Sequence, residues 1–182
     1  MSKVDVYSQR DLVSNVTVNE DGSATVEQVL TVKNDVPADL DASQKIGYTT
    51  AWSANEWFFY LPLGATDPQI QAPSGYRKTA TYPDGLGRMV STTEGTIAPQ
   101  ATDVLKFSYK IAPGTFTRQG GGYSYHDQLN PQPMQQAVSL TVNVAFSGGA
   151  KCTSSPGWSA TGAGATWSGE QSIRRTLNLE CS

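Results

Sequence analysis

The sequence predicts an all-β fold, an antiparallel β-sandwich of immunoglobulin-like architecture with long loops. Short segments along the chain alternate apolar and polar residues, which is the period of a half-buried strand. The 17 glycines and 10 prolines supply turns, and no window has the spacing of an amphipathic helix. We expect residues 1–182 to form one domain, because a chain of this length buries roughly 70% of its unfolded surface.

A hairpin is predicted near the start of the chain. Residues 12–19 and 24–33 both alternate apolar and polar side chains. Between them lies a Glu-Asp-Gly-Ser turn, in which Gly22 can adopt the positive φ that such turns require.

The densest apolar stretch is residues 56–65, which read Glu-Trp-Phe-Phe-Tyr-Leu-Pro-Leu-Gly-Ala. It predicts a strand that ends where Pro62 removes a backbone donor. Its aromatic residues do not alternate with polar ones, so we expect both faces to be covered. The main core would cover one face and the loop of residues 34–55 the other.

The remaining segments follow the same rules. Further strands are predicted at residues 76–82, 88–93, 104–111, 136–146 and 173–181. Residues 83–85, Pro-Asp-Gly, predict a turn, and residues 112–133 are expected to be irregular because they carry a triple glycine and an Asn-Pro-Gln-Pro sequence.

The only two cysteines, Cys152 and Cys181, predict a disulfide. The bond would close a loop of roughly 30 residues and make residues 147–182 a disulfide-closed C-terminal extension of the same domain. A disulfide places the protein in an oxidising compartment, outside the cytosol. The alternative is a cytosolic protein with two reduced, buried thiols.

Charge and hydropathy exclude several classes of partner. The formal net charge is -3 and the basic residues are scattered, so we expect no nucleic-acid binding. No run of 18 apolar residues exists, so this segment is not expected to insert into a membrane. The N-terminus lacks the apolar region of a signal peptide, so an extracellular location implies that the chain is part of a longer protein.

The sequence offers little for catalysis. His126 is the only histidine, and its neighbour Asp127 would point to the opposite face of a strand. The acidic residues lie mostly in turns and do not form an obvious pair for glycoside hydrolysis. We therefore expect no catalytic residues, no metal ligands and no cofactor. A hydrolase domain with an unrecognised site is the less favoured alternative.

A glycan-binding module for cell-wall or capsular polymers is a further alternative. Aromatic rings near Asn, Gln and Asp can stack on sugar rings and bind their hydroxyls. Five aromatic residues in turn-rich regions are candidates for this stacking: Trp52, Tyr123, Tyr125, Trp158 and Trp167. The competing explanation is that the tryptophans cover the ends of a sandwich.

Several short motifs occur in a suggestive order. They are Asp21-Gly22-Ser23-Ala24, Asn34-Asp35, the phrase of residues 60–65, Leu105-x-Phe107-x-Tyr109, Tyr123-x-Tyr125, the Asn-Pro-Gln-Pro of residues 130–133, and Val138-x-Leu140-x-Val142. This order, over residues 12–146, resembles the C-terminal β domain of a family of membrane-anchored, uncharacterised actinobacterial cell-surface proteins, a domain of unknown function. That family has no assigned activity, so the resemblance implies only a location outside the cell, after an N-terminal anchor.

These observations favour a non-enzymatic, extracellular structural or interaction module of a bacterial cell-envelope protein. Its expected partner is a cell-envelope polysaccharide or another surface protein.

Overall fold

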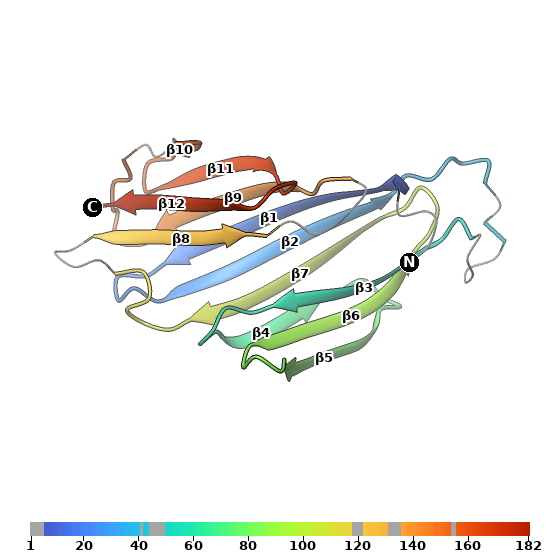
Figure 1. Cartoon of the computed structure of the whole chain (residues 1–182), viewed down its shortest axis with the longest axis horizontal. Helices are drawn as coiled ribbons and strands as arrows, with labels where there is room; N and C mark the ends of the chain where they lie inside the picture. Colours follow the sequence, from blue (N-terminus) through green and yellow to red (C-terminus); the bar gives the residue numbers. More distant parts are fainter. Residues whose placement is uncertain (1–5, 41, 44–49, 118–121, 131–135, 154–155) are drawn as a thin grey trace.

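The computed structural model describes residues 6–40, 42–43, 50–117, 122–130, 136–153 and 156–182. These residues contain no α-helix, and the strands dominate (Figure 1). The strands are β1 (Ser8–Val18), β2 (Ala24–Asn34), β3 (Ser53–Tyr60), β4 (Thr66–Gln71), β5 (Arg77–Pro83), β6 (Met89–Ile97), β7 (Thr102–Ile111), β8 (Tyr123–Leu129), β9 (Ser139–Phe146), β10 (Trp158–Ala160), β11 (Gly164–Glu170) and β12 (Arg175–Cys181).

The strands form one large sheet and two small ones. The large sheet has seven strands in the order β10-β11-β9-β1-β2-β7-β4, and the small sheets are β12-β8 and β3-β6-β5. Figure 1 shows β12 and β8 along the β9–β1 part of the large sheet, and β3, β6 and β5 at its β7–β4 end. The predicted all-β, sandwich-like fold is confirmed, with a second layer made of two separate sheets.

One strand pair departs from the predicted antiparallel arrangement. β1 and β9 run parallel, with Leu12 opposite Leu140 and Val16 opposite Val144. A parallel pair needs a long crossover connection. Here the chain between β2 and β9 supplies it, because that part of the chain builds the second layer before it returns to the large sheet.

Two clusters of buried side chains join the layers. The larger packs Tyr125, Leu177 and Leu179 of the two-stranded sheet against residues of the large sheet such as Val16 and Val142. The smaller packs Ile97 of β6 against Leu30, Val32 and Leu105. Each small sheet therefore buries one face on the large sheet.

The aromatic strand is not covered on both faces, so that prediction is wrong. Trp57 and Phe59 pack against the core, but Phe58 and Tyr60 are 43% and 54% exposed. The reason is that β3 lies in an outer sheet, whose inner face meets the large sheet and whose outer face meets solvent. The strand ends at Tyr60, shortly before Pro62, as predicted.

The hairpin β1–β2 and the strands β7 and β9 match their predicted segments closely. Four strands were not predicted: β4, β8, β10 and β11. β4 contains Pro68, which signals a turn, but a register shift between Thr66 and Gln69 accommodates it. β8 lies in the segment expected to be irregular, and it pairs with β12 along its whole length.

The C-terminal residues 147–182 belong to both layers. β11 pairs with β9 in the large sheet, while β12 pairs with β8 in the second layer. Trp158, Trp167, Leu177 and Leu179 of this segment are all buried in the main core.

Candidate functional site

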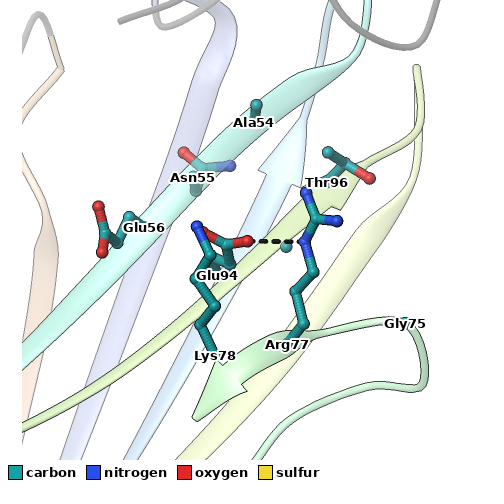
Figure 2. Close-up of a pocket in the computed structure, with 9 residues that line it drawn as sticks. Ala54, Asn55, Glu56, Gly75, Arg77, Lys78, Glu94 and Thr96 are labelled. Carbon is teal, nitrogen blue, oxygen red and sulfur yellow. Dashed lines mark ion pairs between the residues drawn. The ribbon is translucent and has the colours of Figure 1, made fainter. Parts of the chain in front are cut away.

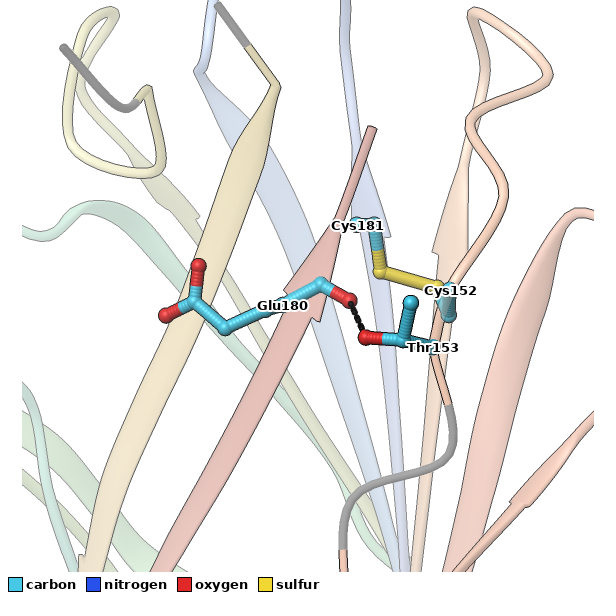
Figure 3. The surroundings of a disulfide bond; sticks show 4 residues. All are labelled: Cys152, Thr153, Glu180 and Cys181. Atoms are coloured by element: carbon cyan, nitrogen blue, oxygen red, sulfur yellow. Dashed lines mark hydrogen bonds between the residues drawn. A yellow bond between two sulfur atoms is a disulfide. The ribbon is translucent and has the colours of Figure 1, made fainter.

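The predicted disulfide is present. Cys152 and Cys181 are joined with an S–S distance of 2.06 Å across a sequence separation of 29 residues. Figure 3 shows the bond beside a hydrogen bond in which Thr153 Oγ1 donates to the carbonyl of Glu180 at 3.4 Å. The bond connects the segment that leads from β9 toward β10 with β12, and so links the two layers of the sandwich.

Three of the five predicted glycan-stacking residues are buried. Tyr125, Trp158 and Trp167 are between 3% and 7% exposed and belong to the main core. Tyr125 contacts Phe116 and Trp158 through its ring, with centroids 6.1 and 5.9 Å apart. Their rings are therefore covered by protein and offer no face to a sugar. Around Trp167, the alternation of the apolar Ala165 and Trp167 with polar neighbours is the signal that marks this position as core.

The other two predicted stacking residues are half-buried. Tyr123 packs on Phe146 with ring centroids 5.1 Å apart, and its hydroxyl donates to the carbonyl of Glu20. The indole nitrogen of Trp52 donates to the carbonyl of Ala42 at 3.0 Å. The structure does not bring these five residues together into one exposed platform.

His126 lies on β8, not in a loop. It is exposed, and its Nδ1 lies 2.6 Å from Oδ1 of Asn178 on the neighbouring strand β12. Asp127 instead accepts a hydrogen bond from the hydroxyl of Tyr125 at 3.1 Å. The two neighbours therefore engage different partners, as expected for consecutive residues of a strand.

A different set of exposed aromatic residues gathers on the outer face of the three-stranded sheet. Tyr60 and Tyr82 flank Val90 from the two sides, and Phe58 pairs with Thr92 in the next row. Phe58, Tyr60 and Tyr82 are 43%, 54% and 42% exposed. Val90, between the two tyrosines, is only 2% exposed. We call this part of the sheet the aromatic row.

The guanidinium of Arg88 lies over the ring of Tyr60, 5.3 Å from its centroid. Asp84 holds this guanidinium through two contacts of 2.9 Å, one to Nε and one to Nη2. Backbone hydrogen bonds from the Arg88 and Leu86 amides, together with the Arg88 side chain, lower the pKa of Asp84, so this carboxylate stays ionised. The turn thus fixes one ring of the aromatic row in place.

Next to the aromatic row lies a hollow of about 480 Å³. Glu94 of β6 ion-pairs with Arg77 at 2.6 Å and with Lys78 at 2.8 Å. These contacts, the hydrogen bond from Lys78 first among them, lower the pKa of Glu94. Figure 2 shows both basic side chains reaching toward Glu94, while Glu56, its cross-strand partner on β3, points away.

Two consecutive basic residues can reach one carboxylate because the strand is irregular there. In a regular strand, neighbouring side chains point to opposite faces. Lys78 has a φ of 52°, and the pairing of β5 with β6 shifts register between Arg77 and Ala80. The local backbone turn brings both side chains to the outer face. The hollow is lined by two basic residues, Arg77 and Lys78, and two acidic ones, Glu56 and Glu94, so it presents charged groups of both signs.

These functional residues were missed because the sequence does not show which face of a segment will be solvent-exposed. The run of residues 56–60 looked like core, and Arg77-Lys78 looked like a scattered basic pair. The alternation Glu56, Phe58, Tyr60 was the available signal, since it places one acidic residue and two rings on the same face.

Comparison with known proteins finds structural similarity alone. No family model matches the chain, and no curated protein matches it. The fold is similar to that of a Legionella pneumophila protein described as a candidate nutrient-binding protein, at 13% identity and a TM-score of 0.54, over 95% of this chain and 67% of that one.

Weaker likenesses extend to two enzymes. An M1 zinc metallopeptidase of Deinococcus radiodurans is 14% identical, with a TM-score of 0.43 over 95% of this chain and 42% of that one. Native leukotriene A4 hydrolase of Saccharomyces cerevisiae is 9% identical, with a TM-score of 0.49 over 96% of this chain and 29% of that one. The chain thus spans less than half of either enzyme, and these likenesses are too weak to inform its activity.

Among the described residues, no group of three or more His, Cys, Asp and Glu side chains is arranged to hold a metal ion. No helix in that part of the chain is long and apolar enough to cross a membrane.

Proposed function

We propose that this chain is a non-enzymatic, extracellular interaction module of a bacterial cell-envelope protein, and that it binds its partner through the outer face of the three-stranded sheet. The observation that carries the proposal is the aromatic row beside the hollow at Glu94. Exposed aromatic groups and Arg next to polar groups are the composition that binding surfaces favour.

Three further features support this proposal. The disulfide is stable in an oxidising compartment, which fits an extracellular location. The sequence resembles the C-terminal domain of anchored actinobacterial surface proteins. The chain also covers 67% of the candidate nutrient-binding protein of Legionella pneumophila, as a module of a longer protein would.

A cell-envelope polysaccharide is a second candidate partner beside a surface protein. It is favoured by the three exposed rings of the aromatic row, Phe58, Tyr60 and Tyr82. These rings take the place of the stacking residues predicted from the sequence, most of which are buried. Phe58 and Tyr82 would stack on sugar rings, while Arg77 and Lys78 would bind hydroxyl or anionic groups.

The test is binding to purified bacterial cell walls, before and after digestion of their proteins. We expect the Tyr60→Ala/Tyr82→Ala double variant to lose most binding. The matched control, Val104→Ala/Ile173→Ala, removes two exposed apolar side chains elsewhere and should bind normally. Loss of binding after protein digestion identifies a protein partner, and retention identifies a polysaccharide. Equal binding by both double variants would refute the role of this face.

A parallel assay addresses catalysis at the same site. Glu56 and Glu94 are directly paired across β3 and β6, but the Glu56 carboxylate points away from Glu94, so the two do not form the close carboxyl pair of a retaining glycosidase. We expect no release of reducing sugar from the cell walls. Release that disappears in Glu94→Gln would make the chain a hydrolase and would overturn the non-enzymatic proposal.

A further inference from the structure

The two small sheets of the second layer leave a groove between them. Its floor is the inner face of the large sheet, and two cavities of about 270 Å³ each occupy it. Both cavities are lined by Gln28, so they adjoin at this residue, and we call the two together the track. Alternate residues of β1 line the track from one end to the other: Arg10, Leu12, Ser14 and Val16.

The walls of this groove are strand edges. Consecutive residues of a strand point to opposite faces, so a cavity that contacts four in a row meets the edge of the strand. One cavity is lined by residues 57–60 of β3, and the other by residues 124–127 of β8. The groove therefore runs along the backbone edges of both small sheets.

Neither edge is filled by another strand of the described chain. β3 pairs only with β6, and β8 pairs only with β12, apart from contacts of residues 116–117 at the start of β8. Half of the N–H and C=O groups of an edge strand point away from its one partner. These groups are templates for an added strand. Figure 1 shows that β3 and β8 run in opposite directions, so a strand between them would be parallel to one and antiparallel to the other.

The floor combines apolar and charged groups at defined places. Leu12, Val16 and Leu30 offer apolar contacts along the track. Arg10, only 5% exposed, lies at one end with its guanidinium 6.0 Å from the centre of the Trp57 ring. Asp127 lies at the other end, beside the hydroxyl of Tyr125. The groove thus has a positive end and a negative end.

We propose that this groove binds an extended peptide segment of a partner protein, which adds a strand between β3 and β8. Backbone hydrogen bonds to the two edges would supply affinity, and alternate side chains would contact the floor. The seven residues from Arg10 to Val16 span about 20 Å of strand, so the segment is about seven residues long. It carries apolar residues toward Leu12, Val16 and Leu30 and a basic residue toward Asp127.

The experiment is selection from a phage-displayed library of unconstrained peptides of about ten residues on the folded chain. We expect the selected peptides to bind Gln28→Trp at least about tenfold more weakly, because the new ring fills the groove. Thr25→Trp, which adds the same ring on the opposite face of β2, should leave binding unchanged.

An alanine scan of a selected peptide reports its conformation. Sensitivity at every second position is expected for a strand, whereas a period of three to four would indicate a helical ligand and overturn the proposal. Peptides that bind Gln28→Trp as well as the unmodified chain would also overturn it.

A measurement on the unmodified chain does not depend on the variants folding. Hydrogen exchange of the β3 and β8 amides should slow when the peptide binds, while the β5 amides should not change. Unchanged exchange in β3 and β8 would refute strand addition. A Tyr82→Ala single variant tests the outer face separately, because Tyr82 lies on β5 and lines neither cavity of the groove, so either proposal can fail without the other.

Discussion

Phe59 of β3 stacks on Phe107 of β7, with ring centroids 4.8 Å apart and planes inclined by 26°. Phe59 contacts both hydrophobic clusters, and Phe107 is 1% exposed in the larger one. The pair joins the three-stranded sheet to β7, the strand next to the β4 edge of the large sheet. We therefore consider it the main hydrophobic contact that holds the outer face in position.

Phe59→Ala should lower the free energy of unfolding by about 3 kcal/mol, the lower end for a Phe-to-Ala change in a core, because Phe59 is only partly buried. Urea denaturation measures this loss. Phe58→Ala is the matched control, since the adjacent ring lies on the outer face and should cost less than about 1 kcal/mol. Equal losses in the two variants would show that the Phe59–Phe107 stack does not stabilise the fold.

The Cys152–Cys181 bond gives a second prediction. Replacing both cysteines by Ala should lower the free energy of unfolding by about 3 to 4 kcal/mol, because the unfolded chain then loses its cross-link across 29 residues. Chemical denaturation with and without a reductant measures it. The unmodified chain should become less stable in reductant and the double variant should not respond. A double variant as stable as the parent would contradict the prediction.

The sequence predicted the parts of the fold that depend on alternation alone. β1, β2, β7 and β9 each have one apolar face, and the large sheet buries that face. β8 was missed because glycines precede it and because its own polar residues interrupt the alternation of apolar and polar side chains. Its position depends on pairing with β12, some 50 residues later in the chain, which local sequence does not encode.

The candidate site was harder to predict for a related reason. Whether Tyr60 or Trp167 is exposed depends on which sheet the strand joins and which face of that sheet is covered. Trp167 lies on β11 of the large sheet, whose inner face is covered, whereas Tyr60 lies on the outer face of a small sheet. The sequence alone does not distinguish an exposed aromatic residue from a buried one. For this reason three of the five residues predicted to stack on sugars are buried.

The backbone at Lys78 gives a third prediction. A side chain at its φ of 52° costs about 1 kcal/mol or more, and glycine avoids that cost. Lys78→Gly should therefore be about 1 kcal/mol more stable than Lys78→Ala, although both lose the ion pair with Glu94. Ala80, which follows the register shift in β5, serves as the control. Ala80→Gly should destabilise the fold by about 0.5 to 1 kcal/mol. Urea denaturation ranks the variants, and a Lys78→Gly variant less stable than Lys78→Ala would refute the strain.

Tyr109 should make the fold sensitive to alkali. Burial, and then the charge of Asp127, raises the pKa of Tyr109 to about 12, whereas in an unfolded chain the pKa of Tyr is about 10. Above pH 10 the unfolded chain loses this proton while the folded chain keeps it. Stability is therefore complete below pH 10 and falls as the pH rises toward 12, by about 1.4 kcal/mol per pH unit.

The measurement compares the unmodified chain with Tyr109→Phe at pH 8 and pH 11. The unmodified chain should lose about 1.4 kcal/mol more between these two pH values, because the Phe variant has no proton to lose at this position. Tyr76, whose pKa is also raised by burial, is present in both proteins, so its effect cancels in the comparison. Burial is the largest cause that raises the pKa of Tyr125 and the charge of Tyr109 the smallest, so the effect of Tyr125 differs little between the two proteins. Equal losses in the two proteins would mean that Tyr109 ionises as readily in the folded chain as in the unfolded chain.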